Sequence, residues 1–418
     1  MTKKIIAITF IFICTSIAWA ILGATVFSRT YDSGITSSSR VASTWGAPQK
    51  QTPPTAVFMT KITKESQTVE NNQLVKKTWT EDSPTPLPLE SSKVNVDLNL
   101  EHRQKGLLWY STYKVNFAGT YGFRNTSDKE QDVIFNFPFP TTQAIYDNLT
   151  FAVDGNPVAI TNENNSAKTS IKLDAGKSAQ LEVGYTSQGL NDWRYSFGSD
   201  HVTQVKDFNL QMSTNFKEID FPENTLSPSE KQETSKGWNL NWSYKNLVSG
   251  YEIAMVMPEK IQPGPLAGVI SLFAPVSLFF FFFLMLIITT MRGIDLHPMN
   301  YFFLAAAFFS FHLLLAYLVD HISIHASFAI ASAVSVFLVV SYLRLVVGMR
   351  FASREAALAQ FIYLVMFSYA FFLKGFTGLA ITIGSVLTLF VVMQLTGRVR
   401  WAERFAGKST AQTSAEMS

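Results

Sequence analysis

Uninterrupted apolar runs occupy the two ends of the chain and leave a more polar region between them. The first run covers residues 5–27 and follows Lys3-Lys4. Further runs cover residues 265–291, 298–319, 326–347, 356–373 and 376–397. A helix needs about 20 apolar residues to cross the hydrocarbon core of a bilayer, so the pattern predicts one N-terminal and about five C-terminal transmembrane helices. The last two runs are joined only by Lys374-Gly375, which leaves a re-entrant segment as an alternative for one of them.

The first run has a second interpretation, because Ala18-Trp19-Ala20 resembles the cleavage site of a signal peptide. The apolar run continues beyond this tripeptide to Phe27. The whole run is therefore long enough to span a bilayer, and we favour an uncleaved anchor, with cleavage after Ala20 as the alternative.

Residues 107–264 show a different pattern, in which apolar and polar residues alternate. Examples are YKVNFAGTYGF (113–123), DVIFNFPFP (132–140) and WNLNWSY (238–244). Alternation with period two is typical of strands that have one buried face. FAVDGNPVAI (151–160) and SIKLDAGKSAQLEVGY (170–185) each predict a hairpin around a glycine-containing turn. We therefore expect a large all-β domain, built as an antiparallel sandwich.

Residues 28–106 are less regular. SPTPLPLESS (83–92) is rich in Pro and Ser and predicts a linker, and the mixed Lys/Glu stretch before it predicts an exposed hairpin. The predicted fold class is an α-helical membrane protein with a large extracytoplasmic β domain. Its expected parts are an N-terminal anchor (1–27), an extracytoplasmic stalk with irregular or β structure (28–106), the extracytoplasmic β domain (107–264), a C-terminal helical membrane bundle (265–400) and a cytoplasmic tail (401–418).

The distribution of charged residues predicts how the chain is oriented in the membrane. Residues 28–264 contain 23 Lys/Arg against 26 Asp/Glu, whereas the rest of the chain contains 11 against 5. Basic residues near transmembrane segments stay on the cytoplasmic side, so we expect both termini in the cytoplasm of a bacterium and residues 28–264 in the periplasm. No basic face suits nucleic acid, and the expected partner is the lipid bilayer of the inner membrane.

Linear motifs for catalysis are missing from the sequence. It contains no phosphate-binding loop, zinc-protease motif, serine-hydrolase elbow or dinucleotide fingerprint. Cys14 is the single cysteine, so one chain can form neither a disulfide nor a cysteine-based metal site. We expect a non-enzymatic protein without cofactor or metal, and the oligomeric state stays open.

Four polar residues in the third and fourth apolar regions are candidates for a functional site. His312 lies near the middle of its predicted span, and Asp320, His321 and His325 follow at its end. An ionisable residue inside a membrane is a functional candidate, but a neutral imidazole can also hydrogen-bond between helices. We favour helix packing for His312 and an interfacial turn for the others, with an ion path or a metal site as alternatives.

Two further features concern surfaces. EHRQKGLLWYSTY (101–113) combines charged and aromatic residues, and we expect strand entry there, with Glu101 and Arg103 as candidates for a partner-binding face.

In the apolar runs, small residues recur at helical spacing and predict close helix contacts. These are Ser327, Ala331, Ser335, Ala380 and Gly384.

Several stretches, in this order, resemble the CreD family of bacterial inner-membrane proteins, which are known as cell-envelope integrity proteins. They are VASTWGAPQ (41–49), EHRQKGLLWYSTYKVNFAGTY (101–121), IDLHPMNY (294–301), VDHISIHASFAIA (319–331) and ITIGSVLTLFVVMQLTGRVRW (381–401). The resemblance covers nearly the whole chain. It implies an N-terminal anchor, a β-rich periplasmic domain and a C-terminal helical bundle, and it supplies no catalytic residue.

Three functions are therefore considered. The first is a non-enzymatic protein that supports envelope integrity or stress tolerance and contacts envelope proteins through its outer β domain. The second is a transporter or channel that uses His312 and the Asp320/His321 end of the bundle. The third is a membrane sensor or scaffold that signals to a partner. We favour the first, because the predicted spans contain few polar groups and the tail is too short for a cytoplasmic domain.

Overall fold

The computed structural model describes residues 2–70, 73–198 and 203–397, so the predicted tail lies outside the described residues. The chain divides into two compact units. The helical unit consists of Met1–Thr36, Gly106–Leu108 and Ile261–Ser418. The β unit consists of Ser37–Lys105 and Trp109–Lys260. The coarse prediction of a helical membrane protein with a large β domain is confirmed.

Six helical stretches of the described residues are long and apolar enough to cross a membrane. Four are single α-helices beyond the first: α2 (Pro263–Arg292), α3 (Pro298–Leu318), α4 (Ile324–Val346) and α8 (Thr377–Thr396). The fifth, Met349–Phe372, combines α5 (Met349–Phe351), α6 (Ala357–Gln360) and α7 (Phe367–Tyr369) with the π-helical segments η1 (Ala352–Ala356) and η2 (Phe361–Met366), and ends in the 3-10 turn η3 (Ala370–Phe372).

The first helix, α1 (Thr2–Trp45), is longer than the predicted anchor. We expected an irregular stalk to begin at residue 28, but residues 28–45 are helical. This stretch is polar and contains no proline before Pro48, so nothing in it interrupts the hydrogen bonding of the helix. The helix ends at Gly46, whose φ of +143° is incompatible with helical geometry.

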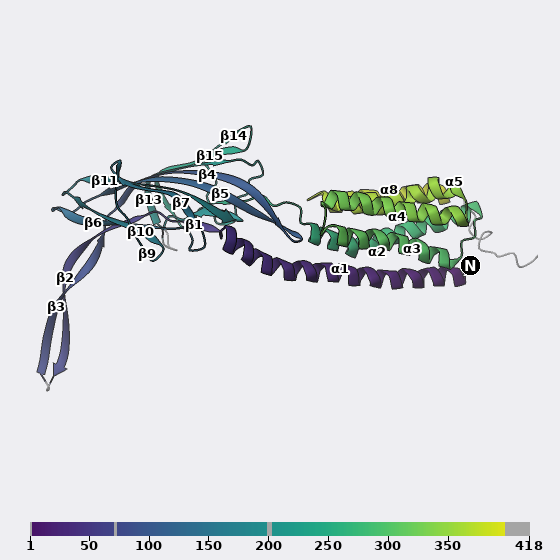
Figure 1. Cartoon of the computed structure of the whole chain (residues 1–418), viewed down its shortest axis with the longest axis horizontal. Coiled ribbons are helices and arrows are strands. Elements are labelled where there is room, and N and C mark those ends of the chain that lie inside the picture. Colours follow the sequence, from purple (N-terminus) through teal and green to yellow (C-terminus); the bar gives the residue numbers. More distant parts are fainter. Residues whose placement is uncertain (1, 71–72, 199–202, 398–418) are drawn as a thin grey trace, which may run out of the picture. The chain divides into compact units, whose positions relative to one another are not determined.

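The β unit contains three sheets (Figure 1). The eight-stranded sheet has the order β14 (Glu230–Glu233), β15 (Trp238–Ser249), β13 (Thr203–Thr214), β4 (Leu89–Lys105), β5 (Leu108–Arg124), β11 (Ser178–Leu190), β7 (Tyr146–Val153) and β8 (Asn156–Pro157). The five-stranded sheet has the order β3 (Gln73–Pro86), β2 (Thr55–Glu70), β6 (Gln131–Pro138), β10 (Ser166–Leu173) and β9 (Thr161–Glu163). The three-stranded sheet consists of β1 (Gln49–Gln51), β12 (Asp192–Tyr195) and β16 (Ile253–Val256).

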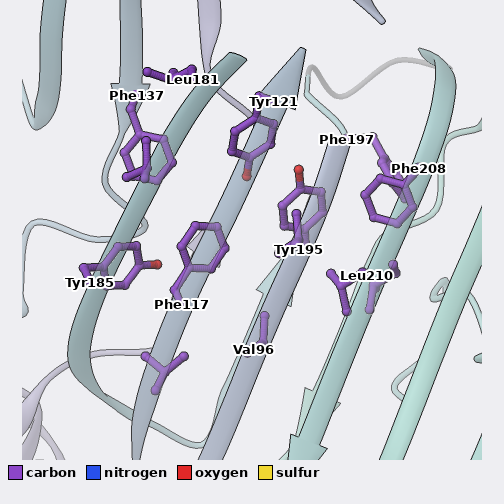
Figure 2. Close-up of a cluster of buried hydrophobic side chains, with 14 of the residues drawn as sticks. Val96, Phe117, Tyr121, Phe137, Leu181, Tyr185, Tyr195, Phe197, Phe208 and Leu210 are labelled. Carbon is purple, nitrogen blue, oxygen red and sulfur yellow. The ribbon is translucent and has the colours of Figure 1, made fainter. Parts of the chain in front are cut away.

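All three sheets contribute side chains to one hydrophobic core, as expected for a sandwich. Phe117 on β5 lies 6.1 Å from Phe137 on β6, between ring centroids, and Tyr195 joins the cluster from β12 (Figure 2). The five-stranded sheet is antiparallel, but the other two sheets are mixed, because β4 pairs with β13, and β1 with β12, in parallel. Parallel neighbours need a long connection, and the many residues between these strands provide it.

One predicted hairpin is confirmed and the other is wrong. Strands β7 and β8 pair around Asp154-Gly155, and both turn residues have positive φ, as a tight hairpin requires. In contrast, β10 pairs with β6 and β9, whereas β11 pairs with β5 and β7. The turn between β10 and β11 therefore carries the chain from one sheet to another. Alternation along a strand cannot reveal this, because it is the same for either partner.

The region before residue 107 is more regular than expected. The predicted exposed hairpin is confirmed as β2 and β3, which form a long two-stranded ribbon (Figure 1). The predicted linker at residues 83–92 is wrong, since it contains the end of β3 and the beginning of β4. Pro84 and Pro86 are tolerated in β3 because β3 is an edge strand, where a missing N–H breaks no ladder bond.

Candidate functional site

His312 is buried in α3 and packs against α1. Its Nδ1 lies 3.1 Å from the carbonyl oxygen of Phe308, one turn earlier in the same helix. Its ring is edge-on to those of Trp19 and Phe311, with centroid distances of 5.5 and 4.8 Å. Nε2 has no hydrogen-bond partner among the described residues. These contacts suit a neutral imidazole that fills space between two helices.

Asp320 is paired with a residue that we did not single out from the sequence. Its Oδ2 lies 3.3 Å from Nη1 of Arg29 on α1. Nη2 of Arg29 also donates to the carbonyl oxygen of Ala316 at 2.9 Å, and the guanidinium lies 5.4 Å from the ring centroid of Tyr317. Arg29 thus holds α1 against the C-terminal end of α3, where a cation also balances the helix dipole.

The two neighbouring histidines do not join this pair. His321 is exposed in the turn between α3 and α4, and His325 packs its ring 5.3 Å from that of Phe372. No group of three or more His, Cys, Asp or Glu side chains that could hold a metal ion occurs in the part of the chain that the structure describes. The structure therefore brings Asp320 to Arg29 and leaves His321 at the surface.

Gln360 is a buried polar residue that our sequence analysis missed. Its Nε2 donates to Oγ of Ser335 on α4 at 2.7 Å, and that hydroxyl donates to the carbonyl oxygen of Ala307 on α3 at 2.6 Å. Its Oε1 has no partner among the described residues. Gln360 lies between the two π-helical segments, which are often found at functional sites. The signal was present, since an amide inside an apolar run is unusual.

Small residues behave differently in the two helices where we predicted close contacts. Ser327, Ala331 and Ser335 are all fully buried, which confirms the predicted packing face of α4. Ala380 and Gly384 on α8 do not mark such a face. A β-carbon on Gly384 would meet no described atom within 4 Å. Helix α8 has a single buried residue among those described, and it contacts η2 through Thr388, whose Oγ1 lies 3.0 Å from the hydroxyl of Tyr363.

In the β unit, Glu101 and Arg103 lie together beside Trp45. The guanidinium of Arg103 lies 3.4 Å from the ring centroid of Trp45, and Nζ of Lys114 lies 6.0 Å from it. Glu101 pairs with Lys114 at 3.0 Å and with Arg103 at 3.8 Å. A cavity of about 350 Å³ adjoins them, lined by Val41, Thr44, Trp45, Arg103, Gln104 and Lys105. We call Trp45, Glu101, Arg103 and Lys114 the Trp45 cluster.

The Trp45 cluster carries more positive than negative charge and contains an aromatic face. Three of its side chains are partly exposed and ionisable, and Nε1 of Trp45 has no partner among the described residues. A cation stacked on an indole is held in place without losing its charge. Such an arrangement can bind a carboxylate or another anionic group of a partner.

Two buried glutamines fix the backbone that follows Trp45. Nε2 of Gln49 donates to Oγ of Ser187 and to the carbonyl oxygen of Gln188, both at 2.9 Å. Nε2 of Gln51 donates to the carbonyl oxygen of Pro138 at 3.0 Å, and Tyr185 donates its hydroxyl to Oε1 of Gln51 at 2.8 Å. The segment is therefore part of the β unit's core rather than a flexible stalk.

Known proteins give one family match and remote structural likenesses. A family profile described as "Inner membrane protein CreD" matches residues 1–402. The chain matches no curated protein sequence. A protein described as nutrient binding, from Legionella pneumophila subsp. pneumophila str. Philadelphia 1, is 10% identical, and the match covers 56% of this chain and 76% of that one with a TM-score of 0.36. An M1 zinc metallopeptidase from Deinococcus radiodurans is 9% identical over 41% of this chain and 42% of its own, with a TM-score of 0.26. Scores at this level support no inference about activity.

Proposed function

Because the chain belongs to the CreD family of inner membrane proteins, we propose that it supports the integrity of the cell envelope without catalysis, using its β unit as the contact surface. One observation carries the proposal. Most of the buried polar side chains of the helical unit form hydrogen bonds within or between its helices, as those of Gln360 and Ser335 illustrate, and single atoms of Gln360 and His312 have no partner among the described residues. The Trp45 cluster, in contrast, is accessible in part and offers charge to a partner.

We further propose six membrane spans, with both termini in the cytoplasm and residues 28–264 in the periplasm. Two ion pairs support this arrangement. Lys4, at the start of α1, lies 2.9 Å from Asp295 in the turn between α2 and α3, and lowers the pKa of that carboxyl. Arg29 reaches Asp320 in the next turn. The start of α1 therefore lies at the same end of the helical unit as Arg292, where the basic residues of a cytoplasmic face are expected.

A transporter is the second candidate. Two buried acceptor atoms favour it, namely Oε1 of Gln360 and Nε2 of His312, neither of which has a partner among the described residues. A transport path needs polar groups that line it from one side of the membrane to the other.

Reversing the charge of the Trp45 cluster is expected to abolish function in cells. In a strain that lacks the protein, Arg103→Glu with Lys114→Glu should fail to restore resistance to detergents and large antibiotics, because a face that attracts anions would repel them. The measurement is growth at matched protein levels. Lys172→Glu with Lys177→Glu makes the same charge change elsewhere in the β unit and should restore resistance. Full resistance with the first pair would contradict the proposal.

A further inference from the structure

A second cavity, larger than the one at the Trp45 cluster, lies where the three sheets of the β unit meet. Its volume is about 600 Å³, within the range of about 300–1,000 Å³ that is typical of small-molecule sites. Its walls include Thr55 on β2, Phe123 on β5 and Tyr195 on β12, which belong to three different sheets. The cavity is partly open to solvent, so a ligand can enter it.

Most of the wall is apolar, and Thr52, Thr55, Ser92 and Gln204 add polar side chains to it. Tyr195, Phe197 and Phe208 form one side, and the ring centroids of the last two lie 4.9 Å apart (Figure 2). Five prolines line other parts of the cavity: Pro53, Pro54, Pro86, Pro88 and Pro138. Proline has no backbone N–H, so the proline-rich wall contributes hydrophobic contact without donors. These surfaces suit a hydrocarbon chain.

The charge of the lining indicates the head of a ligand. Among the described residues that line the cavity, Lys206 is the only one whose side chain is charged at neutral pH. That side chain is exposed. A negative group on the ligand is therefore favoured and a positive one is not.

The wall is held in place by contacts outside the cavity. Nε2 of Gln51 donates to the carbonyl oxygens of Thr52 and Pro138, which holds the segment before β2 in place. The backbone N–H of Leu87 donates to the carbonyl oxygen of Ala56 at 2.8 Å, which joins the two proline-rich segments. A cavity whose walls are fixed before binding loses little entropy when a ligand enters.

We propose that this cavity binds a single-chain amphiphile whose head carries a negative charge. The hydrocarbon chain packs against the prolines and aromatic rings. The head places its negative charge near Lys206. This site goes beyond the proposed envelope function, which does not require it.

Photolabelling tests the proposal with the full chain in lipid nanodiscs. The probe is lysophosphatidylglycerol with a photoreactive group in its acyl chain, and the labelled peptides are identified by mass spectrometry. We expect label on the strands that carry Phe123 and Phe208, in addition to label on the membrane helices. Label restricted to the helical unit would overturn the proposal. Equal label in the β unit with a zwitterionic lysophosphatidylcholine probe would also overturn it.

Three variants make the test specific. Thr55→Trp fills the mouth of the cavity from an exposed position and should abolish the label in the β unit. Lys206→Glu should weaken it about tenfold, whereas Lys245→Glu, an exposed lysine on β15 outside the lining, should have no effect. Labelling that none of these variants changes would contradict the assigned site, and the melting temperature of each variant checks that it folds.

Discussion

Gly46→Ala is expected to lower the free energy of unfolding of the β unit by about 3–5 kcal/mol. Gly46 has φ +143°, a backbone conformation that is open to glycine and strained for any other residue. A β-carbon there would also overlap the carbonyl oxygen of Gln188, which is backbone and cannot rotate away. The substitution therefore forces Trp45 and the following strand away from β11. Urea unfolding of the full chain, followed by near-ultraviolet circular dichroism, measures the loss.

Gly155→Ala is the matched control for this prediction. Gly155 also has positive φ, at +75°, but no described atom lies within 4 Å of the position of its β-carbon. The cost there is conformational only, about 1 kcal/mol. Equal losses for the two variants would show that the close approach of Gly46 to Gln188 does not matter. The two variants should also differ in their ability to restore resistance in cells, since only Gly46→Ala displaces the Trp45 cluster.

The β unit is expected to unfold cooperatively above about pH 10, through the ionisation of its buried tyrosines. Burial raises the pKa of Tyr113, Tyr121, Tyr185 and Tyr195 above the ordinary value for a phenol. The unfolded chain releases these protons near pH 10, whereas the folded chain retains them. The contribution of these tyrosines to the free energy of unfolding is therefore fully present below that pH. Above it, the free energy of unfolding falls by about 1.4 kcal/mol per pH unit for each tyrosine, or about 5 kcal/mol per pH unit for the four.

Tyrosinate absorbance and near-ultraviolet circular dichroism, followed together from about pH 9 to about pH 12, test this expectation. The two signals should change in one transition. Tyr121→Phe should leave stability at neutral pH nearly unchanged, because the Tyr121 hydroxyl faces only that of Tyr195 and forms no hydrogen bond of good geometry among the described residues (Figure 2). Tyr113→Phe should cost about 1–3 kcal/mol, since it removes the bond from Tyr113 to the carbonyl oxygen of Asp192. Tyrosinate that forms gradually, without loss of structure, would mean that the tyrosines are accessible.

Features encoded by neighbouring residues were predictable from the sequence. Apolar runs of sufficient length predicted the helices of the bundle, because length and hydropathy are properties of one segment. Period-two alternation predicted the β domain for the same reason. The packing face of Ser327, Ala331 and Ser335 followed from helical spacing, and all three are buried.

Features that depend on distant partners were not predictable in this way. Arg29 and its acceptor Ala316 are 287 residues apart, so nothing near Arg29 indicated that it binds the end of α3. The chain after β10 enters a different sheet, although the local pattern is that of a hairpin. Ala380 and Gly384 have the spacing of a packing face, but no described atom lies within 4 Å of the β-carbon position of Gly384. In each case the outcome depends on residues that lie far away along the chain.

The candidate site shows the same division. The residues Glu101 and Arg103 were found from their composition, but the stacking of Arg103 on Trp45 brings together residues from α1 and β4. Gln360 was visible as an amide in an apolar run, yet its role depends on Ser335 in another helix.

The central claim is that the polar groups of the helical unit are structural and that function resides in the β unit. Complementation of a strain that lacks the protein tests it most directly, with His312→Leu in one variant and Asp320→Asn/His321→Ala in another. Protein levels and membrane insertion are checked, and resistance to detergents and large antibiotics is scored. We predict that both variants restore resistance as the wild type does. If either accumulates and inserts normally but fails to restore resistance, the claim is contradicted and a charge-dependent path through the helices is favoured.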